Sequence, residues 1–82
     1  MNDVLKQIRK ERGITLRNIR KEAGLTQIEL SLLANIGATT IKTMEKGEIG
    51  WTSDCEMLFI AACEKYSRKV RGVNNLNNSK PL

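Results

Sequence analysis

The chain has 82 residues, enough for one small hydrophobic core. Hydrophobic residues make up 40% of it and aromatic residues 4%, and no stretch shows the alternation or turn dipeptides of a β-hairpin, so we expect an all-α fold. The formal net charge is +5, and seven basic side chains lie within residues 1–21 beside only two acidic ones. This excess indicates either a phosphate-rich partner or a solvated helix surface.

Several classes of protein are disfavoured by what the sequence lacks. It has no His, no paired carboxylates and no Gly-rich phosphate loop, so we expect neither an enzyme nor a bound cofactor. Cys55 and Cys63 without a His cannot complete a zinc site, and eight positions along one helix (about 12 Å) are too far for a disulfide. No apolar run approaches the roughly 20 residues of a membrane span, and no signal peptide opens the chain. We therefore expect a cytoplasmic protein without metal or membrane partners.

The first third of the chain contains an echo, in which LKQIRKERGIT (residues 5–15) is followed at once by LRNIRKEAGLT (residues 16–26). Apolar residues at helical spacing predict a short helix over residues 1–12 that ends near Gly13, and a second helix that ends at Gly24. The echo is interpreted as two similar amphipathic helices. No third copy follows, which argues against a repeat array.

The central and C-terminal segments contain further helix signals. Thr26 and Glu29 fit a capping box that opens a helix to about Ala34, and Asn35 to Gly37 form a turn. A helix over residues 38–46 ends at a glycine, and a second capping box, Ser53 to Glu56, opens a helix to about residue 66. We expect one domain over residues 1–66, with an N-terminal helical extension at 1–12 and five helices in all. Residues 67–82 are polar and are expected to form a flexible tail.

Two short helices joined by a tight turn predict a helix-turn-helix over GLTQIELSLLANIGATTIKTMEKGE, residues 24–48. This stretch resembles the phage Cro/repressor (Xre-like) DNA-binding domains, and the resemblance extends over about residues 13–66. The positions in register are Thr26, Gln27, Glu29, Leu30, Ile36, Ile41, Glu45 and Gly47. A frame starting at Thr15 fails, because Arg20 would then occupy the small buried site. The resemblance implies a lambda-repressor-like fold.

The resemblance also implies roles for individual residues. Gln27 would contact a DNA phosphate, and helix 38–46 would enter the major groove. The matching DNA-facing residues are Ala38, Thr39 and Thr43 towards the bases, Lys42 beside them, and Lys46 near the backbone. Arg17 is a further basic candidate for DNA contact. Like Lys21 and Lys42, it could instead be merely a solvated charge. Arg20 and Glu45 would form a structural ion pair between helices.

This sequence departs from the family pattern in three places. Ile28, Leu32 and Leu33 are apolar where relatives usually carry charge, so either residues 1–12 cover them or they bind a protein. The last helix is apolar on most sides, and a dimer contact is expected through Trp51, Met57, Phe59 and Ile60. Gly37 replaces the Ser or Thr that usually caps the recognition helix.

The resemblance implies a repressor of phage or mobile-element type that binds double-stranded DNA as a homodimer on a two-fold operator. With no ligand-sensing domain expected, relief of repression by a protein antagonist (an antirepressor) is one hypothesis. Two alternatives remain open. The same fold serves as the DNA-binding antitoxin of toxin–antitoxin pairs, and the domain could instead be a protein-interaction module that does not bind DNA.

Overall fold

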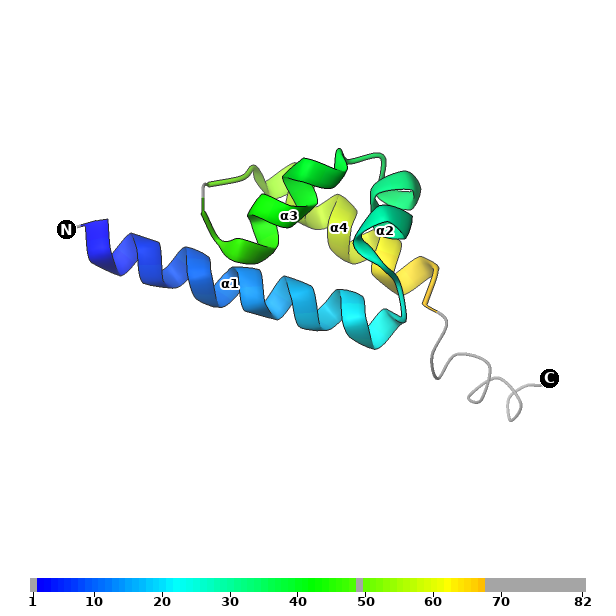
Figure 1. Cartoon of the computed structure of the whole chain (residues 1–82), viewed down its shortest axis with the longest axis horizontal. Coiled ribbons are helices and arrows are strands. Elements are labelled where there is room, and N and C mark those ends of the chain that lie inside the picture. Colours follow the sequence, from blue (N-terminus) through cyan, green and yellow to red (C-terminus); the bar gives the residue numbers. More distant parts are fainter. Residues whose placement is uncertain (1, 49, 68–82) are drawn as a thin grey trace.

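The computed structural model describes residues 2–48 and 50–67, and this part of the chain is entirely helical apart from its turns. The four helices are α1 (Asn2–Ala23), α2 (Gln27–Ala34), α3 (Ala38–Lys46) and α4 (Ser53–Lys65) (Figure 1). The expected all-α class is confirmed, but the expected number of five helices is wrong. The expected tail falls largely on residues 68–82, which lie outside the described residues.

The difference in helix number arises at Gly13, where we expected a helix to end. Instead α1 continues through this residue, which is buried against the C-terminal end of α3. A Cβ atom at Gly13 would lie 2.6 Å from the carbonyl oxygen of Glu45 and 2.7 Å from that of Met44. Glycine in mid-helix costs about 1 kcal/mol relative to alanine, but here its small size allows two helix backbones to touch. Gly13 is therefore a packing residue within one helix.

The turn before α2 has the predicted cap. The Glu29 amide donates to the Thr26 hydroxyl at 3.1 Å, and the Thr26 amide donates to the Glu29 carboxylate at 3.0 Å. Both bonds satisfy amides that would otherwise lack a partner at the helix start. The capping box at Thr26 is thus confirmed.

The cap of α4 differs from the prediction by one residue. Thr52, not Ser53, is the N-cap, and its hydroxyl accepts from the Cys55 amide at 3.2 Å. The Glu56 carboxylate does not return to the helix start as a capping box requires. It accepts instead from the Trp51 indole at 3.0 Å and pairs with Arg12 of α1. The Glu56 carboxylate thus pairs with a residue of another helix, Arg12, instead of with an amide at the start of its own helix.

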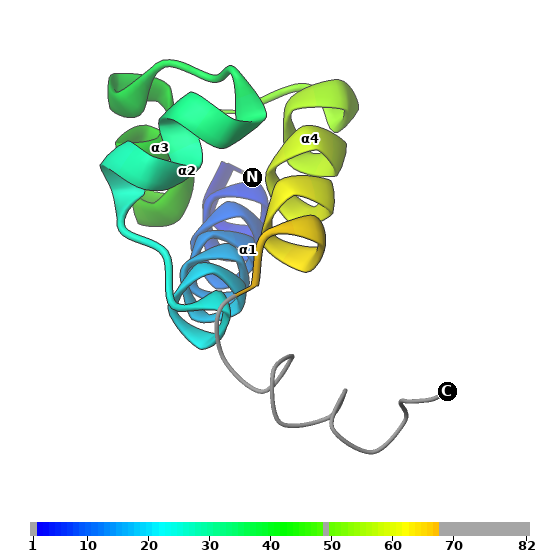
Figure 2. The same ribbon diagram turned by 90° about the vertical axis from the view of Figure 1, so that its right-hand side faces the viewer.

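The core lies between α1, which packs against α3 and α4, and α2, which also packs against both; α3 and α4 lie on the same side of α1 (Figure 1 and Figure 2). The most deeply buried side chains are Leu16, Leu30, Ile41, Met44, Phe59 and Cys63. Burial raises the pKa of the Cys63 thiol to about 11, so this thiol is uncharged at neutral pH. Both cysteines are free. Among the described residues, no helix combines the length and the apolar character needed to cross a lipid bilayer.

The N-terminal turns of α1 do not cover the apolar side of α2. Ile28 and Leu32 are 63% and 78% exposed, and Val4 of α1 is itself 67% exposed. The helix runs past the C-terminal end of α3, away from α2 (Figure 1). The hypothesis that residues 1–12 pack on this side of the motif is therefore wrong. An exposed apolar ridge, consisting of Ile28 and Leu32 one helical turn apart, remains on α2.

Candidate nucleic-acid interface

The turn between α2 and α3 is held by backbone and side-chain bonds. Asn35 adopts the left-handed conformation (φ 58°) that ends α2. The Ile36 amide donates to the Ser31 carbonyl at 3.2 Å, and the Ser31 hydroxyl donates back to the Ile36 carbonyl at 2.6 Å. Ile36 itself is buried in the core. These contacts set the angle between the two helices, which is the feature that a helix-turn-helix must hold constant.

Helix α3 has one buried face and one solvent-facing side. Ile41, Met44 and Glu45 are buried. The predicted DNA-facing residues fall on the other side: Thr39, Lys42 and Lys46 are exposed, and Ala38 and Thr43 are half-buried. The structure thus leaves these five side chains accessible to a large partner.

Thr43 differs from Thr39 in one chemical respect. Its hydroxyl donates to the Thr40 carbonyl at 2.9 Å, one turn back in α3. That bond occupies its only donor, so Thr43 presents its methyl group and the acceptor side of its oxygen. Both features suit apolar contact with thymine or acceptance from an amino group of a base.

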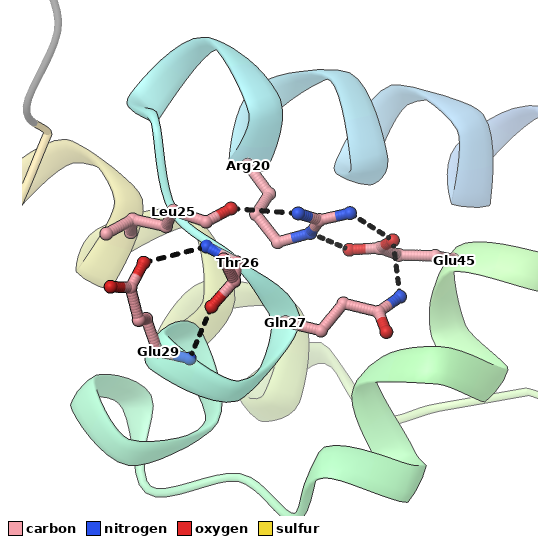
Figure 3. Close-up of polar contacts among 6 residues, drawn as sticks. All are labelled: Arg20, Leu25, Thr26, Gln27, Glu29 and Glu45. Atoms are coloured by element: carbon pink, nitrogen blue, oxygen red, sulfur yellow. Dashed lines mark hydrogen bonds and ion pairs between the residues drawn. The ribbon is translucent and has the colours of Figure 1, made fainter.

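Arg20 and Glu45 form the predicted ion pair between α1 and α3 (Figure 3). The Arg20 Nε and Nη2 atoms donate to the two carboxylate oxygens at 2.6 and 3.0 Å, and Nη1 donates to the Leu25 carbonyl at 2.8 Å. Both charged residues are buried, with exposures of 8% and 7%. A two-pronged, fully bonded pair of this kind fixes the helix that bears Glu45 relative to α1.

Gln27 belongs to the same network. Its side-chain amide donates to Glu45 Oε1 at 3.0 Å, which orients the side chain at the start of α2 (Figure 3). This uses one of the two N–H bonds of the amide group. The second N–H and the backbone amides of Gln27 and Ile28 make no hydrogen bond with another described residue, so they remain available for an anion. The connection between Gln27 and Glu45 was not predicted, because spacing alone does not show which helices meet.

Two adjoining hollows bring together the residues that were predicted to contact the DNA backbone. The first is lined by Arg17 and Lys21 of α1, Gln27 and Ile28 of α2, and Lys42 of α3, among others. The second is lined by Arg17, Gln27, Lys42, Glu45 and Lys46. For Lys21 the sequence left DNA contact and a solvated charge both open, and the structure places it in the first hollow beside Arg17.

The four residues expected at a dimer contact do not share one surface. Phe59 is 0% exposed and belongs to the core, so the expectation that it contacts a second chain is wrong. Trp51 and Ile60 are half-buried against the core, and only Met57 is largely exposed, at 66%. Leu58 beside it is 49% exposed and was not predicted.

Comparison with known proteins agrees with this geometry. Residues 16–53 match the family model described as "Helix-turn-helix". The match begins at the second copy of the echo, so the first copy lies outside it. No curated protein and no solved structure matches the chain. The segment from Leu16 to Ser53 is therefore similar to the helix-turn-helix domains of the Cro/repressor (Xre-like) type, and this similarity supports a DNA-binding transcription regulator.

Proposed function

We propose that this protein is a sequence-specific transcriptional repressor of phage or mobile-element type, with no enzymatic activity and no cofactor. In this proposal α3 enters the major groove of double-stranded DNA, and two copies read the halves of a two-fold operator. The observation that carries it is the solvent-facing side of α3. Thr39, Lys42 and Thr43 are accessible there. On the buried side of α3, the Arg20–Glu45 pair fixes this helix to α1.

The residues divide into readers of sequence and binders of phosphate. Thr39 and Thr43 carry methyl groups that suit thymine and oxygens that can bond to either base type. The start of α2, with its oriented Gln27 amide, lies beside Arg17, Lys42 and Lys46. These side chains would position the DNA backbone. A protein with this division gains affinity from the second set and specificity from the first.

The test is selection of preferred sites from a random duplex library, followed by fluorescence anisotropy on the selected site and on a scrambled one. We expect a preference of about a thousandfold or more. Thr39→Ala and Thr43→Ala should each reduce that preference by about 1–3 kcal/mol without abolishing weak binding to scrambled DNA. Lys65→Gln, on α4, is the matched control and should leave the preference intact. Failure to enrich any sequence would contradict the proposal.

Dimerisation is tested separately by sedimentation. Met57 and Leu58 are the large exposed apolar residues of α4 that a second copy would cover. Met57→Glu should weaken self-association and, with it, the affinity for a two-fold site more than for a half-site. A protein that remains monomeric at micromolar concentration on its operator would exclude the dimeric version.

A second candidate, a domain whose main partner is a protein, is favoured by the exposed apolar ridge on α2. Ile28 and Leu32 are mostly accessible and lie one helical turn apart. An antirepressor could bind there even if the domain also binds DNA. The two candidates separate in the selection experiment, because a pure protein-interaction module would show equal, weak binding to all duplexes.

A further inference from the structure

Six of the seven basic side chains of α1 divide into two sets, and the seventh, Arg9, is half-buried beside Gly50. Arg12 pairs with Glu56 of α4, and Arg20 pairs with Glu45 of α3. The second set is Lys6, Lys10, Arg17 and Lys21, all exposed. Within residues 2–48 and 50–67, the side chains of this second set make no hydrogen bond or ion pair with another residue. Their charges therefore have no direct partner among the described residues and are accessible to a ligand.

The second set forms a single stripe, which we call the α1 basic stripe. Its members follow one another at intervals of four, seven and four residues. At 3.6 residues per turn, these intervals keep all four within about 60° of one another around the helix axis, over a length of about 22 Å. The 11-residue echo produces this arrangement, because 11 residues are close to three full turns. Lys6 and Lys10 repeat the positions of Arg17 and Lys21.

The far end of the stripe lies beside the end of α3. Gly47 (φ 69°) touches α1 so closely that a Cβ atom there would lie 2.6 Å from the Arg9 carbonyl oxygen and 2.7 Å from the Lys10 Cα. This contact creates a third hollow, lined by Asp3, Lys6, Gln7, Lys10, Lys46, Gly47 and Glu48. Its lining therefore includes three lysines and two acidic residues. Lys46 also lines the neighbouring hollow with Arg17 and Lys42, so the basic surface continues from the helix-turn-helix to the first turns of α1.

We propose that Lys6 and Lys10, together with Lys46, bind phosphates of the DNA backbone beyond the stretch contacted by the helix-turn-helix itself. This inference rests on the proposed function, and it assigns a role to the part of α1 that precedes the family match. A DNA strand is the occupant that the geometry favours. It is a long polyanion, and such a ligand can follow a surface on which basic side chains recur from Lys42 through Lys46 to Lys10 and Lys6.

The N-terminal turns of α1 would then act as a rigid arm. Lys6 and Lys10 project from a helix that is continuous with the core, so the backbone that carries them does not have to become ordered on binding. Contacts to phosphate carry no sequence information. The arm should therefore strengthen binding to every duplex, and each neutralised phosphate should steepen the dependence of log K on log salt by about 0.9.

The test measures that slope by fluorescence anisotropy with one 30-bp duplex of scrambled sequence, across a salt series. We expect Lys6→Gln and Lys10→Gln each to reduce the slope by about 0.9, and the double variant by about 1.8. Lys65→Gln removes the same single charge from α4 and should not change the slope. The charge-preserving Lys6→Arg/Lys10→Arg variant should retain the wild-type slope. Circular dichroism should show unchanged helix content, because glutamine is a good helix former.

The outcomes are distinguishable. If the wild type binds the duplex and the double variant has the same slope and affinity, the inference is overturned while the proposed function stands. If Lys65→Gln reduces the slope as much as Lys10→Gln does, the effect is one of net charge, and the inference that Lys6 and Lys10 contact phosphates is again overturned. If the wild type binds no duplex at any salt concentration, the proposed function fails and this inference fails with it.

Discussion

The two copies of the echo have nearly the same sequence and very different surroundings. In the second copy Leu16 is 2% exposed and Arg20 is buried in an ion pair, whereas their counterparts Leu5 and Arg9 in the first copy are respectively 49% exposed and half-buried without an ion pair among the described residues. Both copies lie on one continuous helix. The same residue types thus contribute to the core where α3 and α4 cover α1, and to an exposed surface where neither helix covers it.

The largest difference is expected between Arg20→Gln and Arg9→Gln. The first leaves the Glu45 carboxylate buried without its cation and should reduce the free energy of unfolding by about 3–5 kcal/mol. The second removes a side chain that lies along Gly50 without an ion pair among the described residues and should cost less than about 1 kcal/mol. Urea denaturation of both variants measures the difference. Equal losses would mean that the two copies are energetically equivalent after all.

Leu16→Ala and Leu5→Ala test the same comparison in the apolar residues. Removing the buried Leu16 side chain should reduce the free energy of unfolding by about 2–5 kcal/mol, through lost burial and the cavity left behind. Leu5 is half exposed, so its truncation should cost less than about 1 kcal/mol. Thermal melting provides the readout. A large loss at Leu5 in the isolated protein would indicate that a second copy covers the first turns of α1, and its concentration dependence would show this.

The glycines that close each copy should respond to different replacements. Gly24 has φ 77°, which asparagine tolerates better than most residues, so Gly24→Asn should cost only about 1 kcal/mol. Gly13 is helical, but any side chain there meets the carbonyl oxygens of Met44 and Glu45. Gly13→Asn should therefore cost about 1–3 kcal/mol, from displacement of α3. The prediction fails if Gly13→Asn is the milder of the two in urea denaturation.

Sequence-based prediction succeeded where the interaction is local or where the family motif specifies it. The capping box at Thr26 spans three residues, and the left-handed turn at Asn35 depends on one residue. The Arg20–Glu45 pair was found only because the resemblance to the family assigned both positions. Prediction failed at Phe59, because an α4 that is apolar on most sides does not reveal which side faces the core.

The sequence by itself determined the helical class, the capping box at Thr26 and the turn at Asn35, because these depend on contacts within about one turn of helix. Only the tertiary structure decided that Gly13 lies inside a helix, that Glu56 binds Arg12 instead of capping α4, and that the second copy is buried while the first is not. Periodicity defines the faces of a helix. Whether a face is covered depends on residues far away in the chain, and here it depends on where α3 ends.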